Sequence, residues 1–304
     1  MIRTRGIHKA FDGRPVLRGV DLEVARGEIF GFVGPNGAGK STFLKSLIGV
    51  VRADGGEAEI AGVDALRHPL RARREVGYAP GETALYHRMR ASELIDFAIR
   101  FHPAADRGRA AELLERFGLP PAQRVGDFSH GMKRKLLLAQ ALASGAPVML
   151  LDEPMEGLDP EARRLVEGIL REEAAAGRTV FFSSHDLASV ERVCDRVAFL
   201  RGGRLLQVGT LEELLRPLAG SLPVHLREAR EAGELPAVPG GEWSGGGRSW
   251  RLRFSGTLEA ALPALATLPI ERLGSREGGL EELFEALYGP EAATGAGGPE
   301  EGAA

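Results

Sequence analysis

Residues 34–42 read GPNGAGKST, and this short stretch decides how the surrounding chain folds. It fits the pattern G-x-x-x-x-G-K-[ST], in which glycines allow successive backbone N–H groups to point inward and surround a phosphate chain. The apolar run from Ile29 to Val33 is typical of a buried strand, and the apolar residues after the stretch recur on one face of a helix. The stretch therefore predicts a strand, a phosphate-binding loop and a helix, whereas an ordinary glycine-rich turn would leave that order unexplained.

The side chains of this loop predict a site for a nucleoside triphosphate and Mg²⁺. Lys40 would lie between the β- and γ-phosphates, where one close charge pair contributes roughly 4 kcal/mol at the dielectric of a partly buried site. Ser41 would ligate Mg²⁺ through its hydroxyl, and Thr42 would reach the α-phosphate. The helix that begins near Lys40 would add free N–H groups and the positive end of its dipole. The expected nucleotide contacts are Gly34, Pro35, Asn36, Gly37, Ala38, Gly39, Lys40, Ser41 and Thr42.

A second segment that can handle phosphate is VMLLDEP, residues 148–154. An apolar strand that ends in two acids places both carboxylates at the edge of the sheet, beside the phosphates. There Asp152 can hold the Mg²⁺ shell through water, and Glu153 can polarise a water molecule. The alternative is a strand followed by a capped helix, but the phosphate-binding loop in the same chain favours the chemical interpretation.

The order of the remaining patterns indicates an α/β domain with a helical insert. Residues 20–24 alternate like a half-buried strand, residues 92–119 have helical periodicity, and buried strands return at 148–151 and 179–182. A further pair of strands is expected across Gly202–Gly203. The simplest organisation is a sheet domain over residues 1–218, with the helical insert at about 82–145.

The rest of the chain predicts a small second domain, because 304 residues in one compact unit would be unusual. It is expected over residues 222–289, with a strand at 249–254 after a turn at Gly245–Gly247, a helix at 258–265, a strand at 269–273 and a final helix from 279. The tail PEAATGAGGPEEGAA, residues 290–304, is predicted to be disordered.

The composition narrows the classes of function. The formal charge of −3 comes from 39 basic and 42 acidic residues, so no polybasic surface favours nucleic acid. The single cysteine, Cys194, excludes an intramolecular disulfide framework, and the start of the sequence has no apolar stretch of the signal-peptide kind. The longest uncharged run, Leu136 to Leu151, is too short for a bilayer. A cytoplasmic protein is expected.

Five motifs then occur in one order: GPNGAGKST, FSHGM at 128–132, VMLLDEP, GLDP at 157–160 and SSH at 183–185. In this combination, residues 1 to about 218 closely resemble the ATP-binding subunit of ABC transporters. The resemblance implies a phosphate-loop NTPase (RecA-like) sheet core with an antiparallel β part and a helical insert, plus a small α+β C-terminal domain. It also implies ATP and Mg²⁺ as cofactors, and ATP hydrolysis coupled to transport across a membrane.

The resemblance assigns Ser129 and Gly131 to the nucleotide of a second subunit. In that family two subunits join head to tail, so Ser129 would donate its hydroxyl and Gly131 its amide to the γ-phosphate held by the partner. Asp159 matches the loop that couples the two sites. Ser129 can equally serve as an ordinary helix N-cap, and the two roles can alternate between open and closed states.

Other family positions fall on residues of the same subunit. Phe11 matches the aromatic residue that stacks on adenine, and Val16 would flank the same ring. His185 matches the histidine at the γ-phosphate. With Glu153 as general base, Lys40 and His185 complete the expected catalytic set.

Two departures from the family pattern affect this interpretation. His130 and Met132 replace the second glycine and the glutamine of the usual Leu-Ser-Gly-Gly-Gln. Similar replacements before a basic stretch occur in the exporter branch (ABC-2 type) of the family. In that branch the ATPase and membrane subunits are separate chains. Gly81 stands where the family has a glutamine that contacts Mg²⁺ and water. Either Glu82 substitutes as a metal ligand or the metal keeps an additional water, and the sequence leaves both open.

The expected partners are a second copy or a homologous ATPase subunit, and a separately encoded permease. The permease would place a short helix near Tyr86 to Ser92 and hold the chain on the inner face of the cell membrane. Export of a drug, lipid or other small molecule is the expected function. An importer-type ATPase shares the catalytic motifs, and a soluble ABC ATPase without a transport role would normally carry two sets of them.

Overall fold

A computed structural model describes residues 1–216, 221–254, 258–274 and 279–289 of the chain. The chain divides into two compact units, Met1–Thr210 and Leu211–Ala304, which we describe separately. The first domain was expected over residues 1–218, whereas the second unit already begins at Leu211. The expected exit from the first domain near residue 218 and the tail at 290–304 lie outside the described residues.

The first unit is built on a six-stranded sheet in the order β10-β9-β3-β8-β7-β6. Its inner strands are parallel, and β10 pairs antiparallel with β9. Apolar runs buried on both faces suit parallel strands covered by helices, and every residue of β3, β7 and β8 is buried. The strands are β3 (Ile29–Val33), β6 (Val76–Ala79), β7 (Val148–Asp152), β8 (Thr179–Ser184), β9 (Arg196–Arg201) and β10 (Arg204–Thr210).

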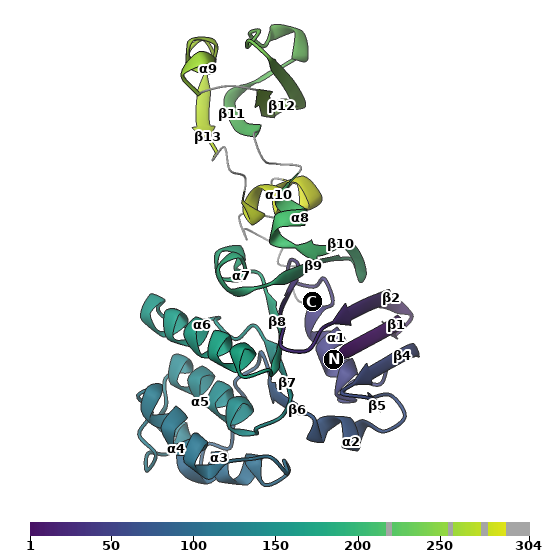
Figure 1. The fold of residues 1–304 in the computed structure, drawn as a ribbon, viewed down its shortest axis with the longest axis vertical. Coiled ribbons are helices and arrows are strands. Elements are labelled where there is room, and N and C mark those ends of the chain that lie inside the picture. The colour runs from purple at the N-terminus through teal and green to yellow at the C-terminus, as the bar shows by residue number, and fades with distance from the viewer. Residues whose placement is uncertain (217–220, 255–257, 275–278, 290–304) are drawn as a thin grey trace, which may run out of the picture. The chain divides into compact units, whose positions relative to one another are not determined.

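Helices cover both faces of this sheet. Figure 1 shows α5 and α6 on one side and α1 on the other. The helices that accompany the sheet are α1 (Lys40–Leu47), α2 (Pro69–Arg74), α6 (Pro160–Ala175) and α7 (Leu187–Val193). The expected order of strand, glycine loop and helix is therefore confirmed by β3 and α1.

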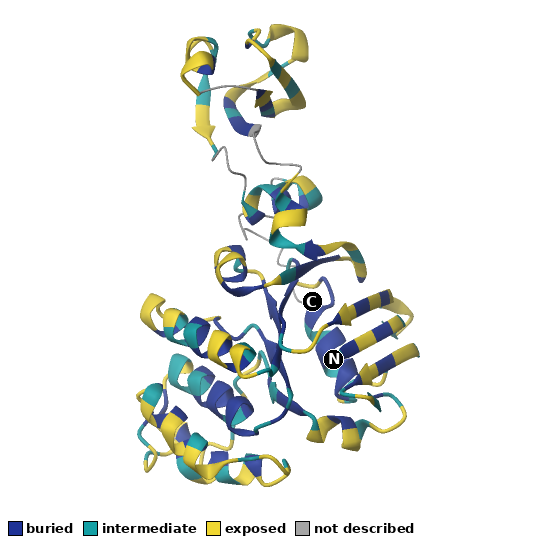
Figure 2. Ribbon diagram, in the orientation of Figure 1, coloured by how far each residue is buried: buried dark blue, intermediate teal, exposed yellow. Residues whose placement is uncertain are grey.

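A second, four-stranded antiparallel sheet has the order β2-β1-β4-β5. Its strands are β1 (Ile2–Phe11), β2 (Arg14–Val24), β4 (Gly55–Ile60) and β5 (Val63–Asp64). Buried and exposed residues alternate along β1 and β2, as Figure 2 shows, so this sheet buries one face only. That face shares one core with the first sheet and α1, in which Phe30 and Phe181 stack with their ring centroids 5.5 Å apart.

The helical insert lies between β6 and β7 in the chain. It contains α3 (Ala91–Ile99), α4 (Arg107–Arg116), the short 3₁₀ helix η1 (Val125–Asp127) and α5 (His130–Ala143). Helix α5 packs against β6 and β7 of the sheet, and several of its leucines, among them Leu136 and Leu138, are buried. In the part of the chain that the structure describes, no helix has the length and apolar character needed to cross a membrane.

The second unit holds a three-stranded sheet in the order β12-β11-β13. Its elements are α8 (Leu211–Leu215), β11 (Ser221–Arg230), the 3₁₀ helix η2 (Ala232–Glu234), β12 (Gly241–Phe254), α9 (Leu258–Leu265), β13 (Ile270–Leu273) and α10 (Leu280–Tyr288). The expected turn at Gly245–Gly247 is wrong, because these glycines belong to β12. There Gly245 has a φ of 128°, and a Cβ atom would lie 2.4 Å from the Ser249 carbonyl oxygen, so only glycine fits this irregular stretch.

Candidate nucleotide site

The loop before α1 forms one wall of a cavity of about 420 Å³. Strand β1 contributes Phe11, β2 contributes Val16, and acidic residues after β7 face them across the cavity. The lining residues are Phe11, Val16, Pro35, Asn36, Gly37, Ala38, Gly39, Lys40, Ser41, Thr42, Glu153, Glu156 and His185. The cavity thus gathers most of the residues expected at the adenine, the phosphates and the attacking water, but Gly34 and Asp152 do not line it. It also adds Glu156, which the sequence analysis missed.

Lys40 is the buried cation of the site, with 5% of its surface exposed. Its Nζ donates to the backbone oxygen of Gly34 at 2.6 Å and to that of Pro35 at 3.3 Å. It also lies 3.2 Å from Oε1 of Glu153. The lysine therefore closes the loop on itself and connects it to the end of β7.

Two glycines of the loop are required by close backbone approaches. Gly39, with a φ of 107°, caps α1, and a Cβ there would lie 2.9 Å from the Val16 carbonyl oxygen. A Cβ on Gly34 would lie 2.4 Å from the Leu200 carbonyl oxygen. These distances are shorter than a Cβ atom tolerates, so the loop folds against β2 and β9 only because these positions lack side chains.

An oxygen-rich corner of the site joins α1 to the ends of two strands. The Ser41 hydroxyl donates to Oδ1 of Asp152 at 3.1 Å, and the Ser183 hydroxyl donates to the same atom at 2.6 Å. Asp152 is buried, so its carboxylate depends on these hydroxyls for hydrogen bonds. A hydroxyl and a carboxylate in contact are the kind of oxygen ligands that Mg²⁺ prefers beside phosphates.

Glu153 occupies a strained turn directly after β7. Its φ of 48° lies in the left-handed region, which a residue other than glycine adopts at a cost. Its N–H donates to the Ser183 hydroxyl at 2.9 Å, and its Oε2 lies 2.9 Å from Nδ1 of His185. The turn directs the carboxylate to the cavity between Lys40 and His185.

The pKa values of this pair move apart. Burial tends to raise the pKa of Glu153, but the hydrogen bond with His185 and the charge of Lys40 outweigh it, so the net pKa is lowered. The hydrogen bond with Glu153 raises the pKa of His185, although burial opposes it. Both changes favour a carboxylate beside an imidazolium.

The expected replacement for the missing glutamine has another partner in this structure. Glu82 is exposed, and its Oε1 accepts a hydrogen bond from Lys45 Nζ at 3.0 Å. Gly81 lies beside the oxygen-rich corner, since a Cβ there would be 3.2 Å from Oδ2 of Asp152. A side chain at this position would therefore start in tight contact with the Asp152 carboxylate.

Ser129 and Asp159 lie outside the cavity, each at the start of a helix. Ser129 is exposed and caps α5, with its hydroxyl accepting from the Met132 N–H at 3.2 Å. Asp159 caps α6, and its carboxylate accepts from Ala162 N–H at 2.8 Å, which lowers its pKa. A Cβ on Gly131 would lie 3.5 Å from the Gly157 carbonyl oxygen, so the FSHGM and GLDP turns are neighbours.

Comparisons with known proteins agree with one another. A family model described as "ABC transporter" matches residues 17–156. The ABC transporter ATP-binding protein YtrB of Bacillus subtilis (strain 168) is 35% identical over 215 residues, which cover 70% of this chain and 73% of that protein. The daunorubicin resistance ATP-binding protein DrrA3 of Streptomyces coeruleorubidus is 35% identical over 243 residues, which cover 78% of this chain and 77% of that protein. The Nod factor export ATP-binding protein I of Burkholderia thailandensis is 37% identical over 235 residues, 73% of this chain and 77% of that protein.

Solved structures resemble this chain as well. An ATP-binding subunit of an ABC transporter has a TM-score of 0.67 and 31% identity, and the match covers 71% of this chain and 92% of that chain. A dimeric bacterial ABC transporter cassette, MJ0796, has a TM-score of 0.64 at 24% identity, with 69% of this chain and 99% of that chain covered. The latter likeness concerns the fold alone.

Proposed function

Because this chain belongs to the family of ABC transporter ATP-binding proteins, we propose that it hydrolyses ATP to drive export through a separately encoded membrane permease. The chain is an ATPase by family. The observation that carries the assignment of its active residues is the meeting of Lys40, Glu153 and His185 in one cavity with the phosphate-binding loop. Relatives named for drug resistance and for Nod factor export support the direction of transport.

The geometry supports attack of water on the γ-phosphate with Glu153 as the general base. Glu153 takes the proton of the attacking water, and Lys40 exchanges Glu153 for the β- and γ-phosphates when ATP enters. His185 holds the γ-phosphate from the other side. A positioned base contributes about 10²- to 10⁴-fold in rate, so Glu153 matters far more for turnover than for binding.

Ser41 and Asp152 would hold Mg²⁺, Ser41 directly and Asp152 through water. Bound there, the ion would neutralise charge on the β- and γ-phosphates. Since Glu82 pairs with Lys45, the metal would keep an additional water molecule instead of taking the Glu82 carboxylate as a ligand.

A second subunit would complete each site through Ser129 and Gly131. The exposed position of Ser129 outside its own cavity supports this arrangement, since a serine meant for the same subunit's nucleotide would line that cavity. The α5 N-terminus would add its free N–H groups to the partner's γ-phosphate. Asp159, next to the FSHGM turn, would contact the partner's phosphate loop.

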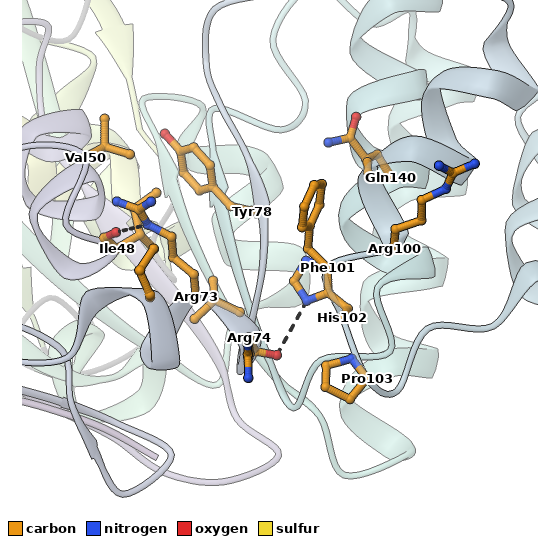
Figure 3. Close-up of a pocket in the computed structure, with 13 residues that line it drawn as sticks. Ile48, Val50, Arg73, Arg74, Tyr78, Arg100, Phe101, His102, Pro103 and Gln140 are labelled. Atoms are coloured by element: carbon orange, nitrogen blue, oxygen red, sulfur yellow. Dashed lines mark hydrogen bonds between the residues drawn. The ribbon is translucent and has the colours of Figure 1, made fainter.

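A groove of about 750 Å³ between the sheet domain and the insert would receive the permease (Figure 3). Ile48, at the end of α1, lines one wall, and Phe101, 64% exposed, points into the groove from the insert. Phe101 packs edge-on against Phe97, and Phe97 packs edge-on against Tyr86, so exposed aromatic rings continue from the groove across the insert. This surface suits a short amphipathic helix on the inner side of the membrane, and α1 connects it to the phosphate loop.

Purification of the tagged chain from membranes of its native host tests this function. We expect the wild-type chain to retain a protein with several membrane spans, and Phe101→Glu to lose it while the purified variant hydrolyses ATP normally. Leu206→Glu, on exposed β10, is the matched control and should retain the partner. A wild-type chain without any membrane partner, or equal retention by Phe101→Glu, would contradict the proposal.

A further inference from the structure

Arg134 on α5 is a buried cation with an incomplete set of partners. It is 1% exposed and is among the largest fully buried side chains in the described residues. One guanidinium nitrogen donates to the Pro80 carbonyl oxygen at 2.9 Å, and the other donates to Oε2 of Glu156 at 3.4 Å. Its Nε has no hydrogen-bond partner in the described residues. A buried ion pair with one long hydrogen bond and one unpaired nitrogen contributes little to stability. The presence of Arg134 in the interior therefore needs another explanation.

The contacts of Arg134 connect α5 of the insert with two segments near the nucleotide cavity, one at Pro80 and one at Glu156. Arg134 itself lies in the first turns of α5, after Ser129 of the insert. Pro80 precedes Gly81, the position beside Asp152. Glu156 lines the nucleotide cavity. One side chain of the insert therefore contacts both the residue before Gly81 and a residue that lines the cavity.

The charges around Arg134 also connect it with the nucleotide site. Burial lowers its pKa, while the carboxylates of Glu156, Asp152 and Glu153 oppose that change. Arginine stays charged in proteins, so Arg134 provides a fixed positive charge close enough to interact with these three acids. Lys40 lines the cavity and contacts Glu153 there, whereas Arg134 belongs to α5 and does not line the cavity.

We propose that Arg134 is a positioning residue for ATP hydrolysis, which holds Glu156 and the Pro80–Gly81 turn in register with the acids of the nucleotide site. This inference rests on the function proposed above. Gly81 has no side chain that could hold the Pro80–Gly81 turn in place. Arg134 holds this turn instead, through its hydrogen bond to the Pro80 carbonyl oxygen. The Glu156 side chain is 51% exposed, so its direction depends on the guanidinium. Because Arg134 moves with α5, a shift of the insert changes the setting of the acids.

Steady-state ATPase kinetics of the purified full chain test the inference, together with nucleotide affinity and thermal stability. We expect Arg134→Met to lower kcat about tenfold, as loss of an outer partner of an active site does, with little change in KM or in nucleotide Kd. Glu156→Gln should lower kcat less, and the double variant should be no slower than Arg134→Met, because the two residues act as one unit. Arg134→Lys should recover part of the rate.

Arg109→Met is the control for a merely structural role. Arg109 also joins the insert to a buried acid, with its guanidinium 2.8 Å from Oε1 of Glu173, but neither residue lines the cavity. It should lower stability and leave kcat unchanged. If Arg134→Met keeps its kcat, or if it fails to fold and Glu156→Gln keeps full kcat, the inference is overturned. A wild-type chain without ATPase activity would instead refute the proposed function.

Discussion

Nδ1 of His185 lies 2.9 Å from Oε2 of Glu153, where two neighbouring parallel strands of the sheet end. The other carboxylate oxygen, Oε1, lies 3.2 Å from Lys40 Nζ. Glu153 therefore lies between the Lys40 ammonium group and the His185 imidazole, on a strained backbone. Both contacts favour the carboxylate form of Glu153, which we propose as the general base, and they lead to predictions that can be measured.

The His185–Glu153 pair predicts a pH dependence of stability. The pKa of His185 is raised from its ordinary 6.5, so its contribution is complete below pH 6.5 and is lost as the pH rises through the folded value. The pKa of Glu153 is lowered from 4.5, so its contribution is present above pH 4.5 and is lost as the pH falls through its folded value. The melting temperature of the wild type should fall more steeply above pH 6.5 than that of His185→Gln. The effect should be small, because half of the His185 side chain is exposed, and parallel curves for the two proteins would contradict the pairing.

Glu153→Gln should separate binding from hydrolysis. Without the base we expect turnover to fall by about 10²- to 10⁴-fold, while ATP still binds and holds two subunits together. Phosphate release measures the first property, and size-exclusion chromatography with and without ATP measures the second. Brisk hydrolysis by this variant would remove Glu153 from its role.

Lys40→Ala should weaken the binding of ATP itself. The lost charge pair with the phosphates predicts an affinity at least about tenfold lower in titration calorimetry. Lys45→Ala on the same helix is the control, since Lys45 pairs with exposed Glu82 and does not line the cavity. Equal affinities for wild type and Lys40→Ala would show that the lysine serves only the loop.

Two substitutions at Ser129 distinguish its cap from its proposed contact with the partner's phosphate. Ser129→Ala removes the N-cap and should destabilise the fold by about 0.5–2 kcal/mol. Ser129→Asp keeps a good cap but places a negative charge at the γ-phosphate, so stability should persist while the ATP-dependent dimer is lost. Dimer formation by Ser129→Asp, tested in the Glu153→Gln background, would leave Ser129 with the cap alone.

Local patterns predicted the parts of the site that depend on neighbours in the chain. Strand β3, the loop and α1 follow from an apolar run and glycine chemistry within a few residues. The stack of Phe30 on Phe181 and the contact of Ser183 with Asp152 join distant segments, and only the register of the sheet brings them together. The pattern gave no means to predict them.

Glu156 and Glu82 show most clearly which features of the site could not be predicted from the sequence. Glu156 follows the left-handed turn at Glu153, and Arg134 donates a hydrogen bond to its carboxylate. Neither feature is visible in the order of residues. Glu82, next to Gly81, was an obvious substitute for the missing glutamine by position. Its pairing with Lys45 depends on how close α1 lies to the segment after β6.

The left-handed backbone at Glu153 implies a trade-off between thermal stability and ATP hydrolysis. Asparagine and glycine adopt this conformation more readily than glutamate, so a laboratory selection that rewards heat resistance alone should drift toward them at this position. Such a selection would enrich an inert molecule. Any evolution of a hardier version must therefore score nucleotide turnover in every round.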